Sequence, residues 1–478
     1  MHGRFSRHLL AVGLFAAAAL VASGLQDAVS SGSFVANLAD SAATPFSTNV
    51  RVTDNTTGFP QHVEPTLVVD SHGVLTAGWK EALTPDGRGQ RVALSRSEDG
   101  GRTWSPNVLK ATTAPGLLQS DPWLTLDEAG GLHYASLEYS SDGGVGGVTV
   151  TNSADGGRTW SAPVQVDDRP GFADKEAMTS DGNGSLYIVY DDVLGNNFDQ
   201  SDDVDLVITR STDRGATWSP TVSVVGTPGN ILGPVVAARP DGRVTVVAWN
   251  LTEGNVLAFT STDHGATWGP AVRVNAFPGS ATWVNNTWMT SMPSLVEDDR
   301  GRLHVAWADY GGGNRDILAA LSVNGTDWFT PAPLNDVTTG DQWMPSLSMD
   351  ARGTLHAAWL DGRTGAWNVY YANSSVPGFL WSANVRVTTA ETPLSFVRPG
   401  DYLALAGDAN GTAYVAWTDG RSGSLAIEFA RSTPFSIPNA PQPFPWAVVV
   451  AVAGGLAVLA AAVILIELRR RRGSPPAP

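Results

Sequence analysis

A short motif with the pattern Ser-x-Asp-x-Gly-x-Thr-Trp occurs four times in this chain and constrains its fold more than any other feature. The Asp of such a motif can accept hydrogen bonds from backbone amides of its own turn, the Gly can adopt a positive φ, and the Trp can pack against a sheet. The motif therefore indicates a structural turn, and its recurrence predicts a repeat architecture. The Asp and Trp residues of the four copies are Asp99 and Trp104, Asp155 and Trp160, Asp213 and Trp218, and Asp263 and Trp268.

A second pattern counts the repeats more completely. An apolar strand, an Asp-x-x-Gly turn and a strand that ends in Ala-Trp-x-Asp or a relative of it follow one another seven times. The spacing of roughly 50 to 60 residues is typical of the blades of a β-propeller. The hairpins are Pro65–Trp79, Pro122–Ser136, Ala177–Tyr190, Pro234–Trp249, Pro293–Trp307, Pro345–Trp359 and Leu403–Trp417. We predict an all-β, seven-bladed propeller over residues 46–437, with six blades as the alternative.

The first and last repeats are expected to complete one another. The seventh hairpin is not followed by the outer strand that the other repeats carry, and the chain runs instead into a proline-rich stretch at residues 438–445. The segment Asn49–Thr53 closely resembles Asn384–Thr388, which closes the sixth repeat. The N-terminal strand is therefore predicted to complete the last blade, because a closed ring leaves no open sheet edge.

Both ends of the chain carry membrane-targeting features. Arg4 and Arg7 precede a short apolar run and small residues, which predicts a signal peptide at residues 1–24, followed by a flexible lead-in at 25–45. Residues 446–468 are apolar except for Glu467, long enough for a transmembrane helix, and a basic tail follows at 469–478. We expect an exported single-pass membrane protein, with a short tether at 438–445, the propeller outside and the C-terminus in the cytoplasm.

The four intact motifs resemble the Asp box, or BNR repeat, of sialidases and related propellers. This resemblance implies that ligands meet the face opposite the Asp boxes, which is built by the loops that lead into each innermost strand and the loops that join the second strand to the third. Carboxylates, arginines and aromatic side chains gather in those loops, a combination that suits sugars. The residues expected to bind are Glu64, Asp121, Asp341, Trp343, Asp361, Trp367 and Asp419.

A sialidase of this family would hold its substrate carboxylate with three arginines and attack with a tyrosine. The candidates that the resemblance implies are Arg363, Arg398 and Arg421 for the clamp, with Asp401 and Tyr402 beside them. The chain departs from the family pattern at Val63, which stands where the first arginine of the clamp belongs. Whether the protein is an enzyme is therefore left open.

Other ligand classes are not expected. The net charge is -16 and clustered basic residues occur only at the extreme C-terminus, so nucleic acid is not an expected partner. The chain has no cysteine, and His133, His304 and His356 recur at one position of the hairpin, which indicates a structural role; no metal or cofactor is expected.

Two functions remain: a surface module that binds glycans or cell-surface proteins, or a membrane-tethered exo-glycosidase of sialidase type.

Overall fold

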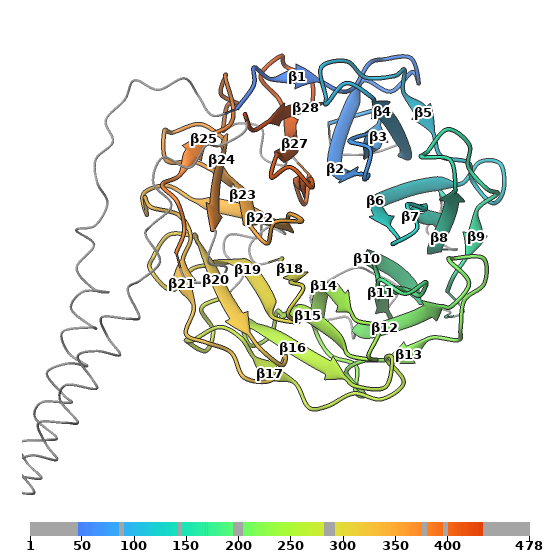
Figure 1. Ribbon diagram of the computed structural model, residues 1–478, viewed down its shortest axis with the longest axis vertical. Coiled ribbons are helices and arrows are strands. Elements are labelled where there is room, and N and C mark those ends of the chain that lie inside the picture. Colours follow the sequence, from blue (N-terminus) through green and yellow to red (C-terminus); the bar gives the residue numbers. More distant parts are fainter. Residues whose placement is uncertain are drawn as a thin grey trace, which may run out of the picture. The chain divides into compact units, whose positions relative to one another are not determined.

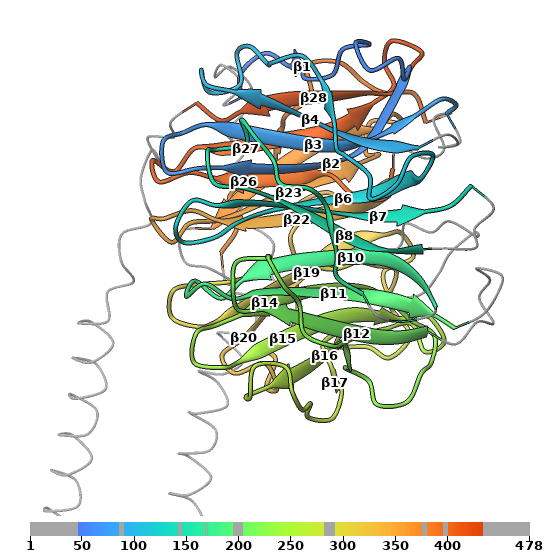
Figure 2. The same ribbon diagram turned by 90° about the vertical axis from the view of Figure 1, so that its right-hand side faces the viewer.

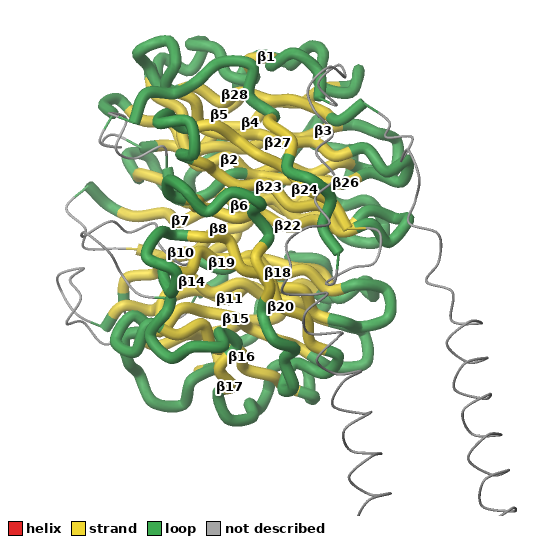
Figure 3. The backbone as a smooth tube through the Cα atoms, turned by 90° about the vertical axis from the view of Figure 1, so that its left-hand side faces the viewer, coloured by secondary structure: helices red, strands yellow, loops and turns green. Residues whose placement is uncertain are grey.

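The computed structural model describes residues 46–85, 90–141, 146–167, 169, 171–194, 204–281, 292–374, 380–394 and 400–433. In this part of the chain, 28 strands form seven four-stranded antiparallel sheets that stand around a common axis (Figure 1). Its strands are joined by turns and loops throughout (Figure 3). The predicted seven-bladed β-propeller is therefore confirmed, and the six-bladed alternative is wrong.

Each sheet is one blade, and its strands follow chain order from the axis outward in blades one to six. The strands of blades one to three are β2 Gln61–Val69, β3 Leu75–Ala82, β4 Arg91–Ser97, β5 Val108–Leu109, β6 Leu118–Leu126, β7 Leu132–Tyr139, β8 Gly146–Ser153, β9 Val164–Gln165, β10 Phe172–Ser180, β11 Leu186–Val193, β12 Val204–Ser211 and β13 Val222–Ser223. Those of blades four to seven are β14 Ile231–Ala238, β15 Val244–Asn250, β16 Asn255–Ser261, β17 Val272–Arg273, β18 Ser294–Glu297, β19 Leu303–Asp309, β20 Asp316–Ser322, β21 Ala332–Pro333, β22 Gln342–Met349, β23 Leu355–Asp361, β24 Asn368–Ser374, β25 Val385–Arg386, β26 Ala404–Gly407, β27 Ala413–Asp419 and β28 Ala426–Arg431.

The last blade borrows its outer strand from the beginning of the chain. Strand β1, Val50–Arg51, pairs antiparallel with β28, so that Val50 faces Phe429, as predicted (Figures 1 and 2). Phe46 forms a further bridge with Ser432. The closure therefore joins residues nearly 400 positions apart, and the chain needs no open sheet edge at this point of the ring.

Apolar residues of the second strand form the core between blades. In five blades the same position of that strand carries a fully buried tryptophan, and a side chain of this size contributes a large apolar area to the packing between neighbouring sheets. These residues are Trp79, Trp249, Trp307, Trp359 and Trp417. The recurrent Ala-Trp-x-Asp ending thus marks a packing position that five of the seven blades share.

The Asp box closes a turn at one end of the blade. In blade three, Asp213 Oδ1 accepts hydrogen bonds from the Thr217 amide at 2.8 Å and the Ser211 hydroxyl at 2.8 Å, while Oδ2 accepts one from the Thr217 hydroxyl at 2.6 Å. These bonds stabilise the carboxylate and lower the pKa of Asp213. Asp99, Asp155 and Asp263 make equivalent bonds.

Strand register places the Asp boxes and the start of the innermost strands at opposite ends. In blade three, Phe172 at the start of β10 pairs with Val193 at the end of β11. Leu186 at the start of β11 pairs with Ser211, which leads into the Asp box. The loops expected to bind ligand therefore lie at the end away from the Asp boxes.

The predicted signal peptide, lead-in, tether, transmembrane helix and tail lie outside the described residues. Within the ranges given above, no helix has the length and apolar character to cross a membrane. The membrane topology therefore stays a prediction from the sequence.

Candidate functional site

A β-bulge interrupts the innermost strand in five blades close to the axis. In each case the register shifts around one residue whose backbone lies in the left-handed region. The residues and their φ values are Glu64 59°, Asp121 47°, Lys175 53°, Gly233 63° and Met344 51°. A residue other than glycine costs roughly 1–3 kcal/mol in such a conformation. Blade four shows that glycine suffices, so the charged side chains of blades one to three are not required by the backbone.

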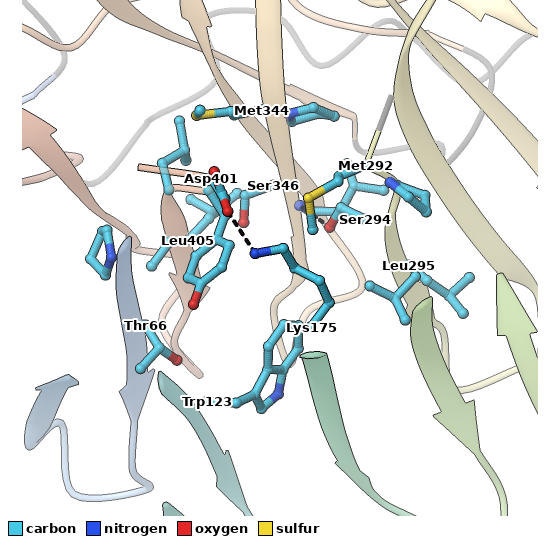
Figure 4. A pocket seen from close by; sticks show the side chains of 18 of the residues that line it. Thr66, Trp123, Lys175, Met292, Ser294, Leu295, Met344, Ser346, Asp401 and Leu405 are labelled. Atoms are coloured by element: carbon cyan, nitrogen blue, oxygen red, sulfur yellow. Dashed lines mark hydrogen bonds and ion pairs between the residues drawn. The ribbon is translucent and has the colours of Figure 1, made fainter. Parts of the chain in front are cut away.

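These bulges border a cavity of about 240 Å³ around the propeller axis (Figure 4). Its wall has two unlike arcs. The polar arc comes from blades two, three and seven and contains Asp121, Lys175, Glu176, Asp401 and Tyr402. The apolar arc comes from blades four to six and contains Pro234, Met292, Pro293, Met344 and Pro345. The polar arc can therefore bind polar groups of a ligand, while the apolar arc can contact the apolar surface of the same ligand.

Lys175 is the centre of the polar arc. Its Nζ lies 3.0 Å from Asp121 Oδ1, 2.6 Å from Asp401 Oδ2 and 3.9 Å from Asp174 Oδ2. Burial lowers the pKa of Lys175, but the three carboxylates outweigh it and raise the pKa well above its usual value. The ammonium therefore stays charged and holds carboxylates from blades two, three and seven around one point.

The carboxyl groups of this cluster have different pKa values. Burial raises the pKa of Glu64 to about 7, although Lys80 Nζ lies 3.4 Å from Glu64 Oε2 and opposes the shift. Burial likewise raises the pKa of Asp174 to about 6. For Asp121, burial is outweighed by Lys175 and Lys80, and the pKa is lowered. Protonated and ionised carboxyl groups thus coexist near neutral pH.

Glu176 is a buried wall residue of the cavity with unused hydrogen-bonding capacity. Its exposed fraction is 3%, and neither carboxyl oxygen has a hydrogen-bond partner among the residues that the structure describes. Burial raises the pKa of Glu176 well above its usual value. In blade three Asp191 is also buried, and its Oδ2 accepts a hydrogen bond from the Gly233 amide at 3.1 Å.

Aromatic side chains complete the polar arc. Trp123 lies beside Lys175, with Met292 and Met344 on the other side of the lysine (Figure 4). The indole N–H of Trp123 donates a hydrogen bond to the Met178 carbonyl at 2.8 Å, which fixes the ring. Burial, together with Asp121 and other nearby carboxylates, raises the pKa of Tyr402 well above its usual value.

Two of the predicted arginines occupy equivalent turns of neighbouring blades. Arg363 makes a two-pronged contact with Asp361, with Nε 2.9 Å from Oδ1 and Nη2 2.7 Å from Oδ2. Arg421 holds Asp419 in the same way, at 2.7 and 2.6 Å. Each guanidinium is therefore engaged with the carboxylate of its own turn. The third candidate, Arg398, lies outside the described residues.

The remaining predicted residues form a packed group in blade six. Asp341 pairs with Arg315 at 3.0 Å, and the Arg315 guanidinium lies over the Trp343 ring. Trp343 and Trp367 are 6% and 9% exposed, and their ring centroids are 4.8 Å apart. The two indoles, which the sequence suggested as binding residues, are not exposed for stacking on a sugar, because they pack against each other and Trp343 also lies under Arg315.

The structure brings together Asp121, Asp401 and Tyr402 in the wall of the cavity and Glu64 in the adjoining cluster. Trp123 was not among the residues selected from the sequence, and Lys175 and Glu176 were not selected as binding residues. One signal could have found them. The bulge residue occupies one column of the seven hairpins, and this column reads Glu64, Asp121, Lys175, Gly233, Met292, Met344 and Tyr402.

Comparison with known proteins agrees with this architecture. The family described as BNR repeat-like domain matches residues 122–356, which run from within β6 of blade two to the start of β23 in blade six. Together with the Asp boxes and the seven blades, this match identifies the class: residues 122–356 carry a BNR repeat-like domain within a sialidase-like β-propeller.

Among solved structures, a Hadza microbial sialidase is 18% identical over 71% of this chain and 68% of its own, with a TM-score of 0.48. The leech intramolecular trans-sialidase is 14% identical over 84% and 70%, with a TM-score of 0.44. An α-L-arabinofuranosidase from Fusarium graminearum is 14% identical over 81% and 98%, with a TM-score of 0.49. Likeness at this level does not bear on activity. No curated protein matches the sequence significantly.

Proposed function

We propose that this protein is a cell-surface-anchored module that binds glycans, and that its ligand occupies the axial cavity. The observation that supports this proposal is the unlike composition of the two arcs of the wall. Sugars present hydroxyl groups at their edges and C–H groups on their faces. Carboxylates such as Asp121 and Asp401 bind the former through charge-assisted hydrogen bonds, and Met292 and Met344 contact the latter.

The size of the cavity limits what can enter. Its volume of about 240 Å³ is below the range of roughly 300–1,000 Å³ that is common for sites of drug-sized ligands. A single sugar unit suits this space better than an oligosaccharide. We therefore propose that a terminal sugar residue is recognised, with the rest of the glycan outside the cavity.

Surface anchoring is supported by the sequence of both termini. Residues 1–24 have the pattern of a signal peptide, and residues 446–468 have the length and character of a membrane span followed by arginines. A short tether at residues 438–445 would keep the propeller near the membrane. Protein partners on the cell surface are the alternative to glycans for the same module.

A glycan array followed by calorimetry tests the binding function, with the full-length protein purified in a mild detergent. Asp121→Asn is expected to lower the affinity for any glycan found by at least tenfold, because the substitution removes an ionised acceptor from the cavity wall. Asp241→Asn makes the same change at an exposed turn of blade four and should leave the affinity unchanged. Failure of the folded protein to bind any saccharide would contradict the proposal.

A second candidate is glycoside hydrolysis, which is supported by the separation of carboxyl pKa values around the cavity. Glu64, with a pKa of about 7, could donate a proton near neutral pH, while Asp121 stays ionised. In a sialidase version, Arg363, Arg398 and Arg421 would hold the substrate carboxylate. Fluorogenic glycosides, sialosides included, test both versions.

The two hydrolytic versions predict different sensitivities. Turnover that disappears in Arg421→Ala would support a sialidase site at blades six and seven. Turnover that disappears in Glu64→Gln but persists in Arg421→Ala would support the carboxylate pair at the axis. A folded protein without turnover on any substrate would contradict both.

A further inference from the structure

The cluster around the axis contains more carboxyl groups than cations. Carboxyl groups from four blades interact with one another and with two lysines, one of which, Lys175, bridges several of them. The carboxyl groups are Glu64, Asp121, Asp174, Glu176 and Asp401, and the cations are Lys80 and Lys175. The pKa values of Glu64, Asp174 and Glu176 are raised, so the two lysines do not offset the burial of these three groups. The polar arc is therefore short of hydrogen-bond donors, and a further cation would stabilise its carboxylates.

Glu176 shows this deficit at the cavity wall. A buried carboxyl group without a hydrogen-bond partner is unusual, because most buried polar atoms are satisfied. Both oxygens of Glu176 lack such a partner among the described residues, although Lys175 immediately precedes Glu176 in the chain. A ligand that supplies an N–H donor would satisfy them.

The β-bulges of blades one to three also indicate a functional role for charged side chains at the axis. Glu64, Asp121 and Lys175 keep charged side chains in a left-handed backbone conformation that Gly233 adopts without strain at the equivalent position of blade four. Strain of this kind persists at sites where the side chain serves a function. Met344 in blade six adopts the same conformation, so the strain concerns the cavity as a whole. The three charged residues among these four lie in adjacent blades, which places the polar function on that side of the axis.

We infer that the polar arc is a subsite for an ammonium group, and that the ligand is a sugar with a protonated amine, such as an amino sugar. This inference rests on the proposed glycan-binding function and names the chemical class of the ligand. The amine lies against Glu176 and the Asp121 carboxylate, and the C–H face of the ring lies against Met292 and Met344. A sugar with a carboxylate is disfavoured, because Lys175 is already shared among Asp121, Asp174 and Asp401.

Calorimetry with matched sugars tests the inference on the full-length protein. The probes are glucosamine, galactosamine and mannosamine, each compared with its parent hexose and its N-acetyl form, which share the ring but lack the charge. We expect at least one amine to bind tenfold or more tightly than both of its neutral counterparts. Addition of the corresponding uronic acid should give no binding.

Variants locate the subsite. Glu176→Gln keeps the size of the side chain and removes the carboxyl group that a bound ammonium would stabilise as a carboxylate, so the preference for the amine should fall to less than threefold. Glu428→Gln in β28 is the matched control: burial raises the pKa of Glu428 as well, but this residue does not line the cavity. It should keep the full preference. If Glu176→Gln does not fold, judged by its melting temperature, Asp121→Asn tests the same preference, because the Asp121 carboxylate is the second group placed against the amine.

The outcomes separate the inference from the proposed function. Equal affinity for an amine and its parent hexose would overturn the inference and leave glycan binding intact. Binding of ethylammonium but of no sugar would support the ammonium subsite and overturn glycan binding. Displacement of a bound amino sugar by Ca²⁺ would overturn the inference in favour of a metal site. Absence of binding by every probe would overturn the inference, while the glycan array decides the proposed function.

Discussion

The ammonium of Lys175 lies 2.6 Å from Asp401 Oδ2, in an ion pair that links blade three to blade seven although the two residues are 226 positions apart. The Asp401 side chain is 2% exposed and that of Lys175 is 15% exposed, so the pair is largely shielded from water. This ion pair in the polar arc thus also links two blades that do not follow one another in the chain.

Removal of this ammonium is expected to destabilise the ring. Lys175→Met leaves Asp121 and Asp401 without their shared cation, and breaking a buried ion pair in this way costs about 3–5 kcal/mol. Urea unfolding of the full-length protein at neutral pH measures the loss. Lys175→Arg, which retains the charge, should lose clearly less, and equal losses in both variants would show that packing rather than charge is responsible.

Stability should depend on pH through the raised pKa values of Glu64 and Asp174. These groups are protonated in the folded protein at pH values where the unfolded chain has ionised them, so their contribution is complete below their ordinary values of 4.5 and 3.8. It is lost as the pH rises through about 6 for Asp174 and about 7 for Glu64. The free energy of unfolding should therefore fall between about pH 4 and pH 7.

The Asp boxes act in the opposite direction in acid. The pKa of Asp263 is lowered to about 2 by hydrogen bonds from Thr267, so its contribution is present above the ordinary value of 3.8 and is lost as the pH falls toward about 2. Urea titrations across this range should show a maximum near pH 4. Glu64→Gln should flatten the decline above the maximum, and a decline that the variant leaves unchanged would assign it to other groups.

Trp123 is expected to contribute to ligand affinity through its ring. Trp123→Leu should weaken the binding of a saccharide about tenfold, since an aromatic contact is worth roughly 0.5–1.5 kcal/mol beyond its buried area. Trp123→Phe should retain most of the affinity. Trp268→Leu makes the same substitution beside an Asp box, and an equal loss there would indicate an effect on the fold. Calorimetry measures all three.

The Asp-box turns should matter for stability and not for binding. Asp213→Ala removes the acceptor of three hydrogen bonds and is expected to cost about 1–2 kcal/mol in the free energy of unfolding. Thr217→Val removes only the hydroxyl donor and should cost about half as much. Because these turns lie at the end of the blade away from the bulges, a change in saccharide affinity in either variant would contradict the separation of the two ends.

The sequence predicts the ring well because each blade is determined by local features. Hairpin spacing, the Asp-x-x-Gly turns and the buried Trp of the second strand repeat within each blade, and the likeness of Asn49 to Asn384 revealed the closing strand. In the structure the Asn49 side-chain amide donates a hydrogen bond to the Val387 carbonyl, and the Asn384 side-chain amide donates one to the Leu334 carbonyl, each in the preceding blade.

The site was predicted only in part, because its contacts cross the ring. The sequence identified Asp121 and Asp401 as loop carboxylates, but only the three-dimensional arrangement shows that Lys175 joins them. In blade six the sequence suggested too much: Trp343 and Trp367 were expected to bind ligand, but both are buried. Their mutual packing depends on how the turn between β23 and β24 folds back over β22, which composition does not determine.

Closure by β1 imposes an order on folding. Blades one to six can each form soon after synthesis, but the last blade needs a strand that was made first, so Val50 and Arg51 wait unpaired until Ala426–Arg431 is available. Contacts of such long range slow the final step. The delay carries little risk of misassembly, because a waiting strand of two residues, one of them charged, is a poor template for pairing with another chain. The brevity of β1 is thus a safeguard during biosynthesis as well as a detail of the finished ring.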